Sequence, residues 1–74
     1  MKTKIIYLNP EEKYIRLDAL LKSEGVFTTG GQAKIAIQNG NVEVNGEICT
    51  MRGKKLYNSD IAKFNNVLYE VHTH

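Results

Sequence analysis

Cysteine, proline and tryptophan are scarce in this chain: its 74 residues include one cysteine, one proline and no tryptophan. The single thiol, Cys49, cannot form an internal disulfide, so the chain suits a reducing compartment and we expect the cytoplasm. Long apolar runs are missing as well. No stretch approaches the ~20 apolar residues that span a bilayer, and the apolar part of residues 1–8 is too short for a signal peptide, so we expect no membrane partner.

The sequence also lacks a recognisable set of catalytic or metal-binding side chains. Cys49, His72 and His74 do not have the spacing of metal ligands. Ser23 and Ser59 have no suitable histidine partner, and the glycines do not match the spacing of a phosphate-binding loop. We therefore expect a protein that is not an enzyme and that has no catalytic residue, no metal site and no cofactor.

Length and charge set further bounds. The 74 residues suffice for one small domain, which we expect to span residues 1–74, and are too few for an interior that encloses a substrate. The net charge is only +2, so the distribution of charge, rather than its total, has to indicate the partner. Nothing in this balance calls for an obligate dimer, and we expect a monomer.

The clearest helix signal lies in the middle of the chain. The helix is predicted to begin after Thr29, with Gln32 completing a capping box, and to end before Gly40. Gly30 and Gly31 then occupy the first two helical positions, where they weaken the helix. One interpretation is that a bare helix start admits the close approach of an anionic backbone. The alternative is that the glycines only make a tight turn between two helices.

A second helix precedes this one. The spacing of Leu17, Leu20 and Leu21 places them on one buried face and predicts an amphipathic helix that ends at Glu24. Its start is open, because residues 9–12 fit either a turn or the N-terminal cap of a longer helix.

The remaining segments predict strands and turns. Residues 4–8 are predicted to form a first strand, and Asn45-Gly46 predicts a tight hairpin between two short strands. Later strands are expected after the basic loop at residues 50–57, at 61–64 and at 67–71, with turns at 58–60 and 65–66 and a frayed end at 73–74. The order predicts an α+β fold, with two short packed helices on a small, mainly antiparallel sheet.

Basic residues gather in one short segment. Arg52, Lys54 and Lys55 lie within four positions, and no acidic residue occurs in residues 48–59. If this segment folds back onto the helices, it stands beside Lys34 and the start of the second helix, and forms a basic patch that includes a helix dipole. Such a patch suits a phosphate backbone, whereas an ordinary solvated loop is the alternative.

The tyrosines bear on how such a patch would read its partner. Tyr7, Tyr14, Tyr57 and Tyr69 lack the paired-aromatic pattern of a base-stacking sheet, and we interpret most of them as core or sheet-face residues. A surface without stacking aromatics reads the shape and phosphates of a folded RNA. The alternative function is a protein-interaction module, in which residues 67–71 offer a sheet edge, with exposed tyrosines, to a partner.

Several short segments occur in the same order in a known family. They are Arg16-Leu17-Asp18, Gln32-Ala33-Lys34, Gly40-Asn41-Val42 leading into Val44-Asn45-Gly46, and the basic segment ending at Asp60-Ile61. Through them, residues 14–64 resemble the S-four domain, also called the αL domain, which is typified by small-subunit ribosomal protein four. The chain is most similar to a stand-alone bacterial subgroup called YaaA-like or YbcJ-like, which shares a Gly-Gly-x-Ala-Lys helix start and an Arg-Gly-Lys/Arg-Lys-Leu segment.

The resemblance implies an αL motif and a non-enzymatic protein that binds structured RNA, ribosomal RNA in particular, with ribosomal proteins as further partners. The alternative function, a protein-interaction module, would be associated with ribosome or ribonucleoprotein assembly. Many family members carry Ser-Arg at the positions of Gly30 and Gly31, so backbone amides and Lys34 are expected to contact the phosphate here. The RNA-binding residues that the resemblance implies are Thr29, Gly30, Gly31, Gln32, Lys34, Arg52, Gly53, Lys54 and Lys55, with Arg16 and Lys22 at the flank.

Overall fold

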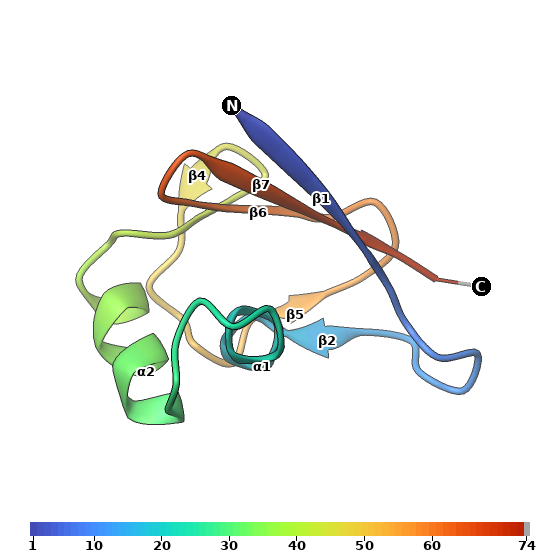
Figure 1. The fold of residues 1–74 in the computed structure, drawn as a ribbon, viewed down its shortest axis with the longest axis horizontal. Coiled ribbons are helices and arrows are strands. Elements are labelled where there is room, and N and C mark those ends of the chain that lie inside the picture. The colour runs from blue at the N-terminus through green and yellow to red at the C-terminus, as the bar shows by residue number, and fades with distance from the viewer. Residues whose placement is uncertain (74) are drawn as a thin grey trace.

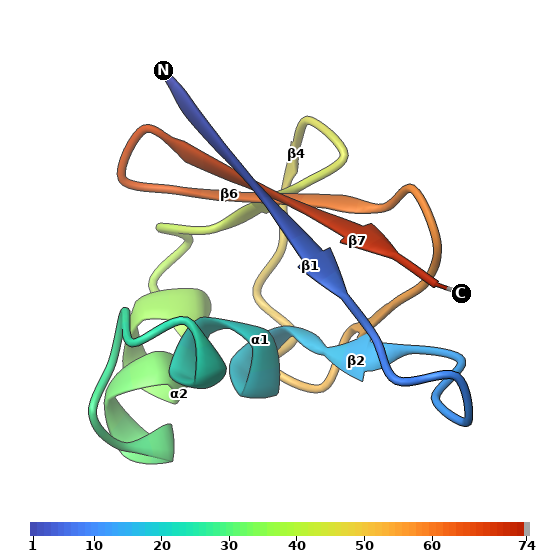
Figure 2. The ribbon, with the colours of Figure 1, turned by 45° about the vertical axis from the view of Figure 1, so that its right-hand side comes forward.

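The computed structural model describes residues 1–73 and has an α+β fold in two layers (Figure 1). One layer is a five-stranded sheet, and the other holds two helices and a separate two-stranded ribbon. Figures 1 and 2 show both helices and the ribbon on the same side of the sheet. The predicted fold class is therefore confirmed.

The large sheet has the strand order β1-β7-β6-β3-β4. Its strands are β1 (Lys2–Tyr7), β3 (Glu43–Val44), β4 (Glu47–Ile48), β6 (Ile61–Phe64) and β7 (Val67–His72). Strands β1 and β7 run parallel, and every other neighbouring pair in this sheet is antiparallel. The sheet is thus mixed and mainly antiparallel, as expected, whereas no sequence pattern indicated the parallel pair.

The position of β7 corrects one prediction. Strand β7 lies between β1 and β6, so residues 67–71 do not form a sheet edge and cannot receive a partner strand there. The cause is long-range pairing: the first strand of the chain returns to the last, in a register that joins Lys2 to Val67 and Tyr7 to His72. Strands β1 and β4 form the two edges of the sheet.

The first helix, α1 (Leu17–Ser23), buries the leucine face that its sequence predicted, because Leu17, Leu20 and Leu21 are all 0% exposed. It begins at Leu17, directly after the extended residues Ile15 and Arg16, and residues 9–12 form a turn rather than the start of a longer helix. In that turn the Glu12 amide donates to the Asn9 carbonyl at 2.9 Å, and the Asn9 amide donates to Glu12 Oε1 at 3.2 Å. Asn9 and Glu12, which could have capped a longer helix, therefore close a turn instead.

The second helix, α2 (Gly30–Gln38), has the predicted limits. Thr29 Oγ1 accepts from the Gln32 amide at 3.2 Å, as a capping box requires. The reciprocal bond differs, because Gln32 Oε1 accepts from the amide and the hydroxyl of Thr28, at 3.1 and 2.9 Å, instead of from the Thr29 amide. Thr28 offers two donors to one oxygen, which explains the shift by one residue. Gly40, with φ of +78°, ends the helix as predicted.

The predicted hairpin is confirmed, since Asn45 and Gly46 have φ of 52° and 86° between β3 and β4, as a type I′ turn requires. The Asn45 side chain also ties this turn to β6. Its Nδ2 donates to Asp60 Oδ1 at 3.2 Å, and its Oδ1 accepts from the Ile61 amide at 3.0 Å.

The core lies between the sheet and the helix layer. Its members are buried apolar side chains from both layers: Leu8, Leu17, Leu20, Leu21, Ile37, Val42, Val44, Leu56, Ala62, Tyr69 and Val71. The aromatic rings of Phe27 and Phe64 pack beside it, with centroids 5.2 Å apart. No helix in residues 1–73 is long and apolar enough to cross a membrane.

The C-terminal prediction is wrong for Thr73, because its amide donates to Asn58 Oδ1 at 3.0 Å and this bond holds the end of β7 against the 58–60 turn. His74 lies outside the described residues.

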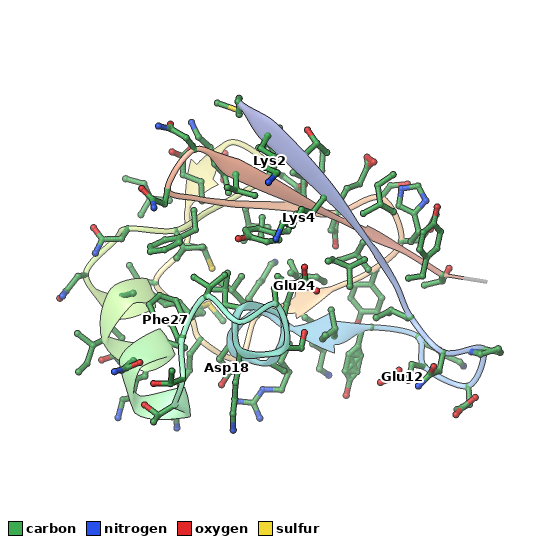
Figure 3. All side chains as sticks on the ribbon, viewed as in Figure 1. Lys2, Lys4, Glu12, Asp18, Glu24 and Phe27 are labelled. Carbon is green, nitrogen blue, oxygen red and sulfur yellow. The ribbon has the colours of Figure 1, made fainter. Side chains whose placement is uncertain are left out.

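Tyr69 makes stability sensitive to alkaline pH. Burial, and secondly the Glu24 carboxylate, raise the pKa of the Tyr69 phenol above its ordinary value of 10.0. Figure 3 shows Glu24 in the space between α1 and the sheet. Because the native state then holds this proton more tightly than the unfolded state, the free energy of unfolding is unaffected by Tyr69 below a pH of about 10 and falls as the pH rises through the native pKa.

We expect this loss to be smaller in a Tyr69→Phe variant. Urea unfolding of both proteins between pH 8 and 11 measures it as the difference between the two pH profiles. Parallel profiles would contradict the assignment to Tyr69, since all other titrating groups are shared.

Candidate functional site

A small β-ribbon positions the end of the basic segment, by which we mean residues 52–55. It pairs β2 (Ile15–Arg16) with β5 (Lys55–Leu56) in antiparallel register, with Ile15 opposite Leu56 and Arg16 opposite Lys55. Leu56 is fully buried and Ile15 packs against the core, whereas Arg16 and Lys55 are exposed. The alternation of side chains along a strand therefore places two cations next to each other on the outer face of the ribbon.

The basic segment is held against the start of α1 by backbone hydrogen bonds. The Leu17 amide donates to the Lys54 carbonyl at 2.8 Å, and the Asp18 amide donates to the Arg52 carbonyl at 3.1 Å. These amides belong to the first turn of the helix, where they have no partner within the helix. The basic segment thus caps α1 with its backbone carbonyls and not with its side chains.

Arg16 links this segment to α1. Its Nη2 donates to Asp18 Oδ2 at 3.1 Å, and its side chain remains 52% exposed. The guanidinium also packs over Gly53, since a Cβ at that position would lie 3.7 Å from Arg16 Nη2. That is an ordinary contact distance, so the neighbour of the Gly53 backbone is Arg16, and alanine would fit there.

The start of α2 reaches the same surface at one point. One open depression is lined by Arg16, Asp18, Ala19, Lys22 and Gly30, so it joins Arg16 of β2 and Lys22 of α1 to the first residue of α2. The ribbons in Figures 1 and 2 show the connection from β4 to β5 running from the sheet down to α1.

The glycines at the start of α2 are not required by the fold. A Cβ at Gly30 would meet nothing within 4 Å, and one at Gly31 would meet only Thr29 Oγ1 at 3.9 Å. Neither glycine has a positive φ, and the first turn of α2 contains no acidic residue. The tight-turn interpretation therefore does not account for these two residues.

The predicted site residues are brought together only in part. The basic segment folds back onto α1. Within residues 1–73, Lys34 makes no hydrogen bond or ion pair with this segment. The Lys54 side chain lines a different depression, together with Thr50 and Met51, beside the β3–β4 hairpin. No three His, Cys, Asp or Glu side chains in the described chain lie close enough to hold a metal ion.

Two aromatic residues were missed. Tyr14 and Tyr57 occupy the next pair of opposite positions beyond the Ile15–Leu56 pair of the ribbon. Their ring centroids are 5.7 Å apart, with an interplanar angle of 52°. They are 38% and 48% exposed, so they are not core residues, and their rings contact each other although the sequence showed no paired-aromatic pattern. The usable signal was the i, i+2 spacing of Tyr14 with Arg16 and of Lys55 with Tyr57, which places each pair on one face of a strand.

Comparison with protein-family models matches residues 8–72 to the S4 domain. Because this match covers most of the chain, the protein belongs to the S4 domain family, and the resemblance is confirmed at that level. The S4 domain is generally an RNA-binding module and is typically non-catalytic. A search of curated proteins finds no match to this chain.

Proposed function

We propose that this protein binds structured RNA, ribosomal RNA in particular, through a basic surface that extends from the start of α2 across α1 to residues 52–55. One observation carries the proposal: residues 52–55 cap α1 with their backbone carbonyls, and the cationic side chains of these residues are exposed beside that of Arg16. Membership of the S4 domain family supports RNA as the partner.

The proposed contacts divide by chemistry. Arg16, Lys22, Lys34, Arg52, Lys54 and Lys55 supply cations for phosphates. Thr29, Gly30, Gly31 and Gln32 supply polar groups and exposed backbone at the start of α2, and Gly53 supplies backbone next to the Arg16 guanidinium. Arginine suits phosphate because its planar guanidinium offers several donors, whereas lysine acts as a point charge. Contacts of this kind recognise the shape and backbone of folded RNA.

We further infer that the chain belongs to the stand-alone bacterial subgroup, acts as a monomer in the cytoplasm, and meets its RNA on the ribosome, beside ribosomal proteins. The segments Gly30–Lys34 and Arg52–Leu56 support the subgroup, because they match its Gly-Gly-x-Ala-Lys helix start and its Arg-Gly-Lys/Arg-Lys-Leu segment.

A salt series tests the proposal. We expect the purified protein to bind a structured ribosomal RNA fragment more tightly than duplex DNA of equal length. For three to five neutralised phosphates, the slope of log affinity against log salt concentration should be roughly −2 to −4. Fluorescence anisotropy across the series measures both quantities.

A slope near zero, or equal binding of RNA and DNA, would contradict the proposal. Capture of a ribosomal protein that survives nuclease treatment and moderate salt would instead favour the protein-interaction alternative.

A further inference from the structure

The outer face of the β2–β5 ribbon carries an ordered set of aromatic and cationic side chains. Tyr14 and Arg16 project from one strand and its extension, and Lys55 and Tyr57 from the other. The positions between them, Ile15 and Leu56, face the core. All four outer residues are exposed, so the ribbon presents two rings and two cations side by side.

The rings are held in place by their neighbours. Tyr14 and Tyr57 pack against each other at 5.7 Å, and Lys55 Nζ lies 4.9 Å from the centroid of the Tyr14 ring. A cation at that distance is attracted to the ring face. Tyr57 is the more exposed ring, at 48%.

We propose that Tyr57, supported by Tyr14, forms a stacking platform for one unpaired nucleobase of the bound RNA, while Arg16 and Lys55 hold the phosphates next to that nucleotide. The inference rests on the proposed function and deepens it. The preferred RNA is a folded RNA with a bulged or otherwise unpaired nucleotide, and not an uninterrupted duplex.

Physical chemistry favours this occupant for the ribbon face. Every base has a π face, so a tyrosine ring accepts it without regard to sequence, and a nearby cation attracts the phosphate that accompanies it. An uninterrupted duplex offers no free π face in its interior.

The test uses two RNA hairpins that differ only by one bulged 2-aminopurine nucleotide in the stem. We expect wild-type protein to bind the bulged hairpin more tightly, and the double variant Tyr14→Leu, Tyr57→Leu to lose about 5- to 150-fold in affinity for it. Binding of the uninterrupted hairpin should change less than twofold. The 2-aminopurine fluorescence should change when wild-type protein binds and should not change with the double variant.

Two controls separate stacking from folding. The variant Tyr14→Phe, Tyr57→Phe keeps both rings and should bind the bulged hairpin as wild type does. Tyr7→Leu removes another exposed tyrosine, on β1, and should also bind as wild type does. Thermal unfolding of each variant shows that it is folded.

Unchanged binding of the bulged hairpin by the leucine variant would overturn the stacking proposal and leave the proposed function standing. An equal loss for both hairpins would also overturn it, because the tyrosines would then act on the whole surface. Failure of wild-type protein to bind either hairpin would overturn the proposed function and this inference with it.

Discussion

Replacing Leu56 with alanine is expected to lower the free energy of unfolding by about 2 to 5 kcal/mol. Leu56 is 0% exposed and lies in the core cluster, although it belongs to a strand of only two residues. The truncation removes apolar contacts and leaves a cavity under the ribbon. The total free energy of unfolding of a small domain is roughly 5 to 15 kcal/mol, so the variant should unfold at a much lower urea concentration.

A matched control is Ile48→Ala in β4, where a side chain of similar size is 68% exposed. Its free energy of unfolding should stay within about 0.5 kcal/mol of wild type. Equal effects of the two substitutions in urea titrations would show that the ribbon does not close the core.

Neutralising Lys54 and Lys55 together should produce a large loss of RNA affinity. Each phosphate contact contributes about 0.7 to the salt slope on single-stranded RNA, so the Lys54→Ala, Lys55→Ala variant should show a slope smaller by about 1.4. Extrapolated from 1 M salt, this corresponds to roughly 25-fold weaker binding at 0.1 M. The fold should persist, because α1 is capped by the Lys54 carbonyl and not by its side chain.

The matched control is Lys2→Ala, Lys63→Ala, which removes the same net charge from β1 and β6. Anisotropy titrations of both variants against one structured RNA, with thermal unfolding as a check of folding, measure the difference. Equal slopes for the two variants would show that overall charge, and not the basic segment, governs binding.

Local features were predictable because they depend on a few adjacent residues. The cap at Thr29, the helix end at Gly40 and the Asn45-Gly46 turn follow from short-range hydrogen bonds and from φ values that few residues tolerate. The leucine face of α1 follows in the same way from the period of the helix. Even here the partner of the Gln32 side chain differs by one residue, because Thr28 competes for it.

The candidate site was predictable as a set of residues and not as an arrangement. The basic side chains in residues 52–55 stand out in the sequence. Their position, however, depends on which backbone amides donate hydrogen bonds to the backbone carbonyls of this segment. The amides that donate to these carbonyls are those of Leu17 and Asp18, at the start of α1. For this reason the basic segment lies beside Arg16.

The sequence by itself determined the two helices, the turns, the α+β class and the concentration of positive charge, since each is written in neighbouring residues. Only the tertiary structure decided that β1 pairs in parallel with β7, that β2 pairs with β5, and that Tyr14 and Tyr57 meet. The partners in these pairs are far apart along the chain. Their pairing follows from the burial of a shared core, because the apolar faces of distant segments can leave water together only in this arrangement.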